Sequence, residues 1–241
     1  MWKEKIGKSQ MIALVAVFAA LNVATDSLAS LPEFPSGVWY SWNFLIMPIT
    51  GIVLGPLLGS AATFIGVMVG HYVYFIDAYE FLFTVGAPVG AAASALLFAG
   101  KWKPVLVYYT VLFAAFLATP VAWQLPPWGM WDTYLAFALL LASTLLIQKG
   151  LWKPELRMLP LILILSAYVG LEADVLFRVF LFVPCRTYSL FYGFDTATLQ
   201  VIWSGAALIT PIKAILSAAI TAIVGYPLIR TLRKTGLRLH Q

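Results

Sequence analysis

Long apolar runs alternate along the chain with short breaks that hold charges, proline or glycine. A helix needs about 20 apolar residues to cross the hydrocarbon core of a bilayer, and the runs are close to this length. They predict eight segments: 9–31, 43–55, 57–76, 81–100, 104–123, 132–148, 158–184 and 198–229. The pattern therefore predicts an all-α fold, in which residues 1–241 form one transmembrane domain, a polytopic helical bundle.

Segment 43–55 decides how many spans the bundle has. It is short and ends at Gly55-Pro56, where proline stops a helix because it lacks an N–H donor and clashes with the preceding turn. The segment is interpreted either as a full, tilted span or as one half of a broken one. We expect about eight spans, with six as the alternative.

Composition supports a location in the membrane. Only 10% of the residues are charged, 62% are hydrophobic and the mean hydropathy is +0.91, whereas a soluble domain carries about 25% charged residues. The single cysteine, Cys185, excludes an intramolecular disulfide and a multi-cysteine metal site. The apolar run that starts at Met11 is long for a signal peptide, so we interpret it as a retained first helix.

Basic residues predict the orientation of the bundle. With eight spans and the N-terminus inside, one side of the membrane receives twelve of the 15 Lys and Arg residues: Lys3, Lys5, Lys8, Lys101, Lys103, Lys149, Lys153, Arg157, Arg230, Arg233, Lys234 and Arg238. The opposite loops hold mainly acidic residues and Arg186. Cytoplasmic loops are enriched in Lys and Arg. We therefore expect a multi-pass protein of the cell membrane with both termini in the cytoplasm, and we attribute the net charge of +5 to orientation in the lipid bilayer rather than to nucleic acid.

Small residues recur at every fourth position in several segments. Ala16, Ala20 and Ala24 form one stripe, and the other stripes are glycine: Gly51/Gly55/Gly59, Gly66/Gly70 and Gly86/Gly90. Such stripes let helix backbones approach closely in lipid. They indicate packing within the protein, and the alanine stripe also allows a second interpretation, the docking of a partner's helix.

Several charged residues fall within the expected spans, where a charge is costly and usually faces a partner or a cavity. They are Asp26, Glu172, Asp174, Arg178 and Lys213. Asp174 and Arg178 lie four residues apart and share a helix face, and Glu172 and Lys213 lie near the middle of adjacent spans, where they could pair. These residues predict internal ion pairs, a polar pocket for a small molecule, or both.

Catalytic signatures are missing from the sequence. It contains no His-Glu-x-x-His, no Gly-x-Ser-x-Gly and no P-loop. We therefore expect a protein that is not an enzyme and that carries neither a cofactor nor a metal. If it belongs to a pump, its ATPase must be another chain.

The first hundred residues resemble the membrane-embedded substrate-binding subunits (S components) of energy-coupling factor (ECF) transporters. Three features carry the resemblance: Ala16-x-x-x-Ala20 in the first helix, the run Trp42-Asn43-Phe44-Leu45-Ile46-Met47-Pro48-Ile49 after a loop with proline and glycine, and the Gly55-Pro56-x-x-Gly59 turn. The resemblance covers about residues 10–100. The family normally has six helices, which departs from the eight expected here.

The resemblance implies transport of a vitamin or related micronutrient, with the ligand held near the outer face. It also implies docking of Ala16, Ala20 and Ala24 on the ECF transmembrane coupling subunit, which works with two cytosolic ATPases. The candidate substrate-binding residues are Asp26, Trp39, Trp42, Asn43, His71, Glu172, Asp174 and Arg178, with rings that stack on a flat ligand and polar groups that orient it. Two other classes stay open: a structural subunit of a larger membrane complex, and a proton- or ion-coupled secondary carrier that uses Glu172 or Asp174.

Overall fold

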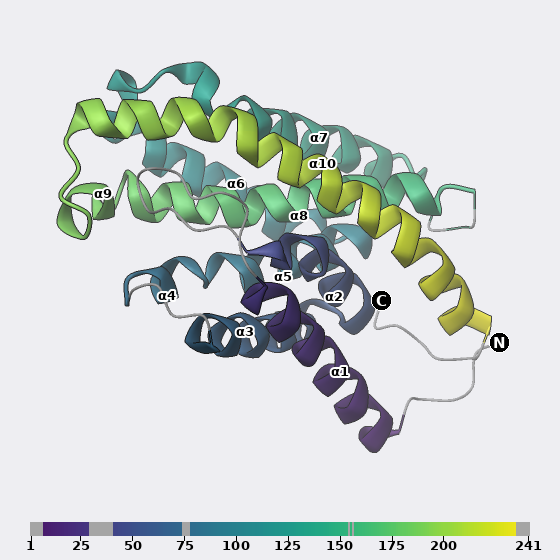
Figure 1. Ribbon diagram of the computed structural model, residues 1–241. Helices are drawn as coiled ribbons and strands as arrows, with labels where there is room; N and C mark the ends of the chain where they lie inside the picture. Colours follow the sequence, from purple (N-terminus) through teal and green to yellow (C-terminus); the bar gives the residue numbers. More distant parts are fainter. Residues whose placement is uncertain (1–6, 29–40, 74–77, 154, 156, 235–241) are drawn as a thin grey trace.

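The computed structural model describes residues 7–28, 41–73, 78–153, 155 and 157–234. In this part of the chain the regular structure is helical, with no strand (Figure 1). The α-helices are α1 (Lys8–Ser27), α2 (Met47–Leu54), α3 (Pro56–Val73), α4 (Glu80–Phe83), α5 (Gly86–Phe98), α6 (Trp102–Leu117), α7 (Trp131–Gln148), α8 (Leu159–Phe182), α9 (Thr187–Leu190) and α10 (Thr196–Lys234). Three short 3-10 helices are η1 (Trp42–Leu45), η2 (Pro120–Gln124) and η3 (Pro127–Met130).

Six helical segments of the described chain are long and apolar enough to cross a membrane. They are Lys8–Ser27, Pro56–Val73, Glu80–Phe98, Pro127–Gln148, Leu159–Phe182 and Thr196–Lys234, and each matches one of the eight expected segments. Their length and composition indicate an all-helical membrane protein. The other two expected segments contain shorter helices, α2 with 8 residues and α6 with 16, and the count of eight crossings stays a prediction.

Segment 43–55 forms a short, buried helix that leads the chain back from α1 to α3, and not a regular membrane-spanning helix. The eight residues of α2 rise only about 12 Å, far less than the ~30 Å of a hydrocarbon core, and all eight are buried. The helix ends at Gly55, whose φ of 83° lies in the left-handed region that favours glycine, and α3 begins at Pro56. Irregular backbone is tolerated at membrane depth only where protein covers it. The burial of α2 shows that protein covers this break.

Helix α8 is the most deeply buried of the long helices and lies at the centre of the bundle. Residues 86 and 90 of α5 meet Asp174 and Gly170 respectively, so α5 runs antiparallel to α8. Tyr109 of α6 donates a hydrogen bond to the Val169 carbonyl, 2.7 Å away. Figure 1 shows α6, α7 and α10 gathered around α8, with α1, α2 and α3 on the other side of α5.

The glycine stripes pack helices against each other, as the sequence predicts. A Cβ added at Gly66 would overlap the Asn22 side chain of α1, and one at Gly70 would lie 2.5 Å from Asp26 Oδ2. A Cβ at Gly90 would lie 2.7 Å from the Gly170 carbonyl oxygen. The contacts of Gly66 with Asn22 and of Gly70 with Asp26 also show that α1 and α3 run in the same direction. The chain must therefore run back between these two helices, and it does so through η1 and α2.

Helix α10 is the longest element, with 39 residues and internal prolines at Pro211 and Pro227. Asp195 precedes it and its Oδ1 accepts a hydrogen bond from the Thr198 backbone N–H at 2.8 Å, which satisfies one of the free donors of the first turn. This bond lowers the pKa of the exposed Asp195 carboxyl. A rise of 1.5 Å per residue gives α10 a length of about 58 Å, so the helix extends beyond the hydrocarbon core.

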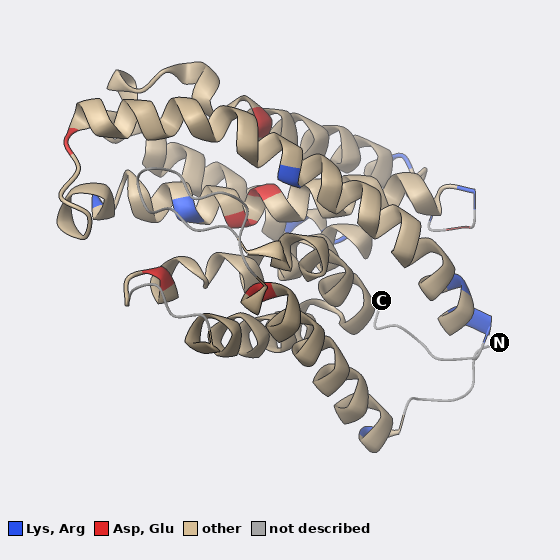
Figure 2. Cartoon of the chain, viewed as in Figure 1, with Lys and Arg blue, Asp and Glu red and all other residues tan. Residues whose placement is uncertain are grey.

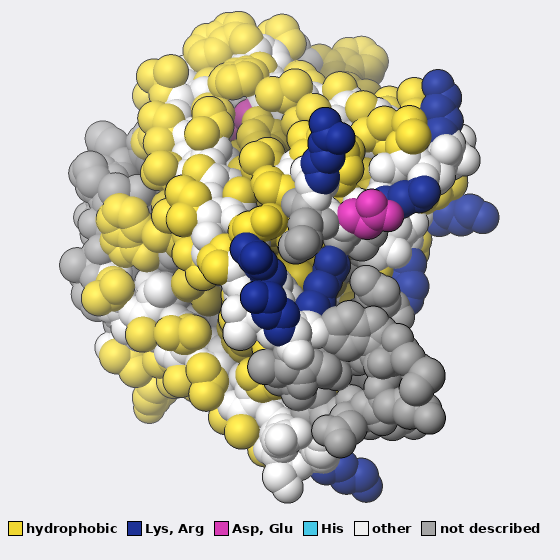
Figure 3. Space-filling view, turned by 90° about the vertical axis from the view of Figure 1, so that its right-hand side faces the viewer, with side chains coloured by type: hydrophobic (Ala, Val, Ile, Leu, Met, Phe, Trp, Pro, Cys, Tyr) yellow, Lys and Arg dark blue, Asp and Glu magenta, His cyan; other side chains and the backbone are white. Residues whose placement is uncertain are grey.

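Most of the basic residues between and beyond the helices gather at one end of the bundle, and Arg186 lies at the other. The beginning of α1, the α5–α6 and α7–α8 connections and the end of α10 all lie at this end, where Figure 2 shows most of the Lys and Arg residues. Viewed from that side, several Lys and Arg side chains stand out on the face among hydrophobic side chains (Figure 3). The described basic residues that the sequence assigns to one side of the membrane therefore also lie at one end of the folded bundle.

Candidate functional site

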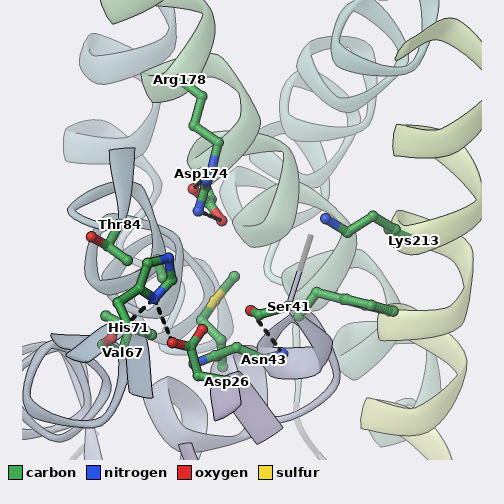
Figure 4. A pocket seen from close by; sticks show the side chains of 12 residues that line it. Asp26, Ser41, Asn43, Val67, His71, Thr84, Asp174, Arg178 and Lys213 are labelled. Atoms are coloured by element: carbon green, nitrogen blue, oxygen red, sulfur yellow. Dashed lines mark hydrogen bonds and ion pairs between the residues drawn. The ribbon is translucent and has the colours of Figure 1, made fainter. Parts of the chain in front are cut away.

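A small cavity of about 30 Å³ (Figure 4) lies beside the C-terminal ends of α1 and α3. Seven elements supply its walls, α1, η1, α2, α3, α5, α8 and α10, together with one residue before η1 and one between α4 and α5. The lining residues are Asp26, Ser41, Asn43, Phe44, Met47, Val67, His71, Thr84, Ala87, Asp174, Arg178 and Lys213. Five of the eight predicted substrate-binding residues, Asp26, Asn43, His71, Asp174 and Arg178, therefore line one cavity.

Asp26 and His71 form a buried pair on one wall of the cavity. His71 Nδ1 lies 2.5 Å from Asp26 Oδ2 and 3.1 Å from the Val67 carbonyl oxygen. Gly70 makes the approach possible, because it brings α3 close to α1 beside Asp26. A carboxylate at this depth needs such a partner, and the pair ties the end of α1 to the end of α3.

Asp174 and Arg178 form the ion pair that their spacing predicts. Arg178 Nε donates to Asp174 Oδ1 at 2.7 Å, and its Nη2 lies 3.5 Å from Oδ2. Gly86 of α5 lies against Asp174, where any larger side chain would overlap the carboxylate. Both side chains face the cavity from α8, above the Asp26–His71 pair in Figure 4.

Lys213 of α10 lies on the opposite wall, and its side chain points toward the centre of the site (Figure 4). Its Nζ lies 5.2 Å from the centroid of the Phe44 ring, within the range of a cation–π contact. The sequence indicates that Lys213 is a charge at membrane depth but not that it belongs to this site. Thr84, Ser41 and the apolar lining residues carry no signal in the sequence that assigns them to the cavity.

Asn43 is the one lining side chain whose polar atoms the described structure leaves unmatched. The residue is only 3% exposed, and neither Oδ1 nor Nδ2 has a hydrogen-bond partner within the described chain. Its backbone N–H donates to Ser41 Oγ at 3.3 Å, which fixes the start of η1. A buried amide without partners is costly, so Asn43 marks a place where a bound molecule would supply both a donor and an acceptor.

Glu172 does not line this cavity, contrary to the prediction. It lies two residues from Asp174, and two residues turn an α-helix by about 200°, so the two carboxylates leave α8 on opposite flanks. Glu172 is fully buried, and its Oε2 accepts a hydrogen bond from Thr133 of α7 at 3.0 Å. This hydrogen bond places Glu172 against α7. The sequence also allowed a pairing with Lys213.

A second polar cluster therefore lies between α7, α8 and α10. Asp132, next to Thr133 on α7, accepts a hydrogen bond from the Thr210 hydroxyl of α10. Glu172 Oε1 has no partner among the described residues. No group of three or more His, Cys, Asp or Glu side chains in the described chain is placed to hold a metal ion.

Neither of the two tryptophans predicted to bind substrate is placed on the cavity wall. Trp42 is absent from the cavity wall, because its ring stacks on the Phe44 ring with centroids 5.9 Å apart, and Phe44 is the residue that faces the cavity. Trp39 lies outside the described residues.

The alanine stripe differs from the glycine stripes because it is on the outside of the bundle. Ala16, Ala20 and Ala24 are all exposed, whereas α1 packs on the bundle through Phe18, Asn22 and Asp26, its buried residues. The interpretation that this stripe packs internally is therefore wrong for the described structure, and its role in docking a partner stays a prediction.

Comparisons with known protein families, with curated proteins and with solved structures found no match. The fold defines an all-helical protein of the membrane class, and the cavity defines a candidate site for a small molecule.

Proposed function

We propose that the chain is the substrate-binding subunit of an ECF-type, ATP-driven importer for a vitamin or related micronutrient. The observation that carries the proposal is the cavity, in which residues from α1, η1, α3, α8 and α10 converge on Asn43, a buried carboxamide without a partner among the described residues. A protein that only held a complex together would gain nothing from an unmatched amide of this kind, since it costs free energy of folding.

The position of the cavity supports capture from outside the cell. Asp26 and His71 lie near the ends of α1 and α3 that point away from the basic end. If the basic end faces the cytoplasm, as the positive-inside rule favours, the cavity lies in the outer half of the membrane and both termini are cytoplasmic.

The exposed alanine stripe supports the proposed coupling to a partner. Small side chains on a helix face allow another helix to approach closely, and α1 presents Ala16, Ala20 and Ala24 outward. We assign this face to the ECF transmembrane coupling subunit, which links the chain to two cytosolic ATPases. Because the sequence holds no P-loop, ATP hydrolysis must occur on those partners.

Substitution of Ala16 by Trp tests this assignment. A bulky ring would block the close approach of a partner helix without a clash inside the subunit, so Ala16→Trp should abolish cellular uptake while the purified chain keeps its ligand affinity and thermal stability. Ala138→Trp, on an exposed position of α7, is the matched control and should leave uptake intact. Loss of binding and expression together in Ala16→Trp would contradict docking on this face.

Mass spectrometry of small molecules released from the purified chain tests the binding function itself. A stoichiometric micronutrient would support the proposal and exclude a purely structural subunit. A chain that carries no small molecule and binds none from a micronutrient mixture would reject it.

A second candidate is a proton- or ion-coupled carrier, because Glu172 is a fully buried carboxyl with one oxygen unmatched among the described residues. The two functions differ in their energy source. Uptake that needs the coupling subunit and its ATPases favours the importer, and uptake by the chain alone that collapses with the proton gradient favours the carrier.

A further inference from the structure

A second, larger cavity adjoins the first and has a different character. It occupies about 130 Å³ between α4, α8 and α10, and Glu80 of α4 is among its lining residues. Apolar side chains form most of its wall, among them Phe83, Val175, Val179, Phe182, Trp203 and Ala206.

The two cavities share one boundary. Asp174, Arg178 and Lys213 line both of them, so these three side chains separate a small polar space beside Asn43 from a larger apolar space beside Trp203. A single ligand that reached both spaces would need a polar end and an apolar body, joined where the charged residues lie.

The size of the apolar cavity limits the body of such a ligand. An apolar protein cavity of about 150 Å³ binds one benzene molecule. A cavity of about 130 Å³ therefore has room for one six-membered ring. The rings of Phe83, Phe182 and Trp203 offer it aromatic contacts.

The partners already present limit the charge of the polar end. Asp26 is paired with His71, and Asp174 is paired with Arg178. Glu80, which lines the larger cavity, accepts a hydrogen bond from the Tyr192 hydroxyl at 3.3 Å. Lys213 lies over the Phe44 ring. A charged ligand would have to displace one of these contacts, which strands a charge at membrane depth.

Asn43 favours a neutral polar end instead. A carboxamide offers one acceptor oxygen and an NH₂ donor side by side, and in Asn43 both are buried with no partner in the described chain. A ligand edge with an adjacent donor and acceptor, such as an amide, a lactam or a ureide, satisfies both atoms and leaves the ion pairs intact.

We infer that the ligand is a neutral molecule with an amide-type edge, bound by Asn43, and a single ring, bound in the apolar cavity between α8 and α10. The inference rests on the proposed function and narrows its substrate class.

Three probes with the same ring and different polar ends test it: benzamide, benzoate and benzylamine. They are titrated by calorimetry against the purified full chain in lipid nanodiscs. Benzamide should bind about ten-fold or more tightly than either charged probe, the scale of one hydrogen bond made or lost. Tighter binding of benzoate or benzylamine, or no measurable binding of benzamide, would overturn the inference.

Two variants separate the polar end from the ring. Asn43→Leu should lower the affinity for benzamide about ten-fold, because the amide loses its partner. Ala206→Leu fills the apolar cavity and should lower that affinity at least as much, with Asn43 unchanged. Ala219→Leu, on an exposed position of the same helix, is the control and should bind benzamide like the unmodified chain. Benzamide binding that survives both Asn43→Leu and Ala206→Leu would also overturn the inference.

The proposed function can survive a failure of this inference. If mass spectrometry finds a bound micronutrient that is charged or carries a fused ring system, the chain is still a binding subunit and the inferred ligand class is wrong. If the purified chain neither carries nor binds any small molecule, the proposed function itself fails.

Discussion

Helix α8 carries two buried carboxylates on opposite flanks, and their surroundings differ in kind. Asp174 faces a cavity and is held by a charged partner, Arg178, at 2.7 Å. Glu172 faces packed protein and is held by a neutral hydroxyl, that of Thr133, at 3.0 Å. A ligand in the cavity can contact the Asp174–Arg178 pair, whereas Glu172 does not line that cavity.

The difference shows that membrane depth alone does not identify a binding residue. The two carboxylates are two positions apart and are both buried. Both were candidates for the same reason, because each is a charge within an expected membrane span. Only the flank from which each leaves α8 separates them. Three substitutions test whether this contrast holds.

The largest effect is expected for Arg178→Met. Loss of the guanidinium leaves Asp174 without its ionic partner, and we expect a decrease in stability of about 2–4 kcal/mol, measured as a fall in melting temperature in detergent. The double variant Asp174→Asn/Arg178→Met should recover much of this loss, because replacing both members of a buried pair can be nearly neutral.

The double variant also separates a structural pair from a cavity wall. If the pair belongs to the binding site, affinity for the ligand that co-purifies with the chain should stay reduced although stability returns. Normal stability together with normal affinity would remove Arg178 from the site.

A smaller effect is expected for Thr133→Val in the second cluster. The change keeps the shape of the side chain but removes the hydroxyl that donates to Glu172, and we expect a loss of about 1–2 kcal/mol in stability without loss of ligand affinity. Thr144→Val on the same helix is the control, because the Thr144 hydroxyl donates only to the Leu140 carbonyl of its own helix. Equal destabilisation by both variants would mean that the Thr133–Glu172 bond contributes nothing specific.

The smallest effect is expected for Glu172→Gln. Glutamine keeps an oxygen that can accept from Thr133 and removes an ionisable group at membrane depth, so ligand affinity should change by less than about two-fold. Asp174→Asn, the matching change on the other flank, should lower affinity about ten-fold, since Arg178 loses its charged partner. If Glu172→Gln weakens binding as strongly as Asp174→Asn, the contrast between the two flanks is wrong, and a carrier that uses Glu172 becomes the better interpretation.

Local patterns predicted the features that depend on one helix or on close helix contact. Asp174 and Arg178 pair because residues four apart on a helix are neighbours. The stop at Gly55-Pro56 is confirmed because proline cannot continue a helix and glycine tolerates a positive φ. The glycine stripes pack as expected because any larger side chain would overlap the neighbouring helix.

Contacts between distant segments were not predictable in the same way. Asp26 and His71 are 45 residues apart, and their pairing depends on α1 and α3 running in the same direction, which follows from the buried return through α2. The sequence allowed a pairing of Lys213 with Glu172 but gave no indication that Lys213 lies on the cavity wall, where the structure places it. Helix periodicity predicts which residues share a face, and it does not predict which neighbour that face meets.

The sequence by itself determined that this chain is helical and apolar enough for a membrane, where its helices break, and that most of its basic residues belong to one end. These properties follow from composition, from proline and glycine, and from charge placement, each of which acts within a single segment. Only the tertiary structure decided that the alanine stripe faces outward, that Glu172 and Asp174 serve different flanks of α8, and that Asn43 lies buried against a cavity without a partner in the described chain. Those outcomes depend on how helices from distant parts of the chain pack together, because helix packing decides whether a polar group meets a partner, a lipid or an empty space.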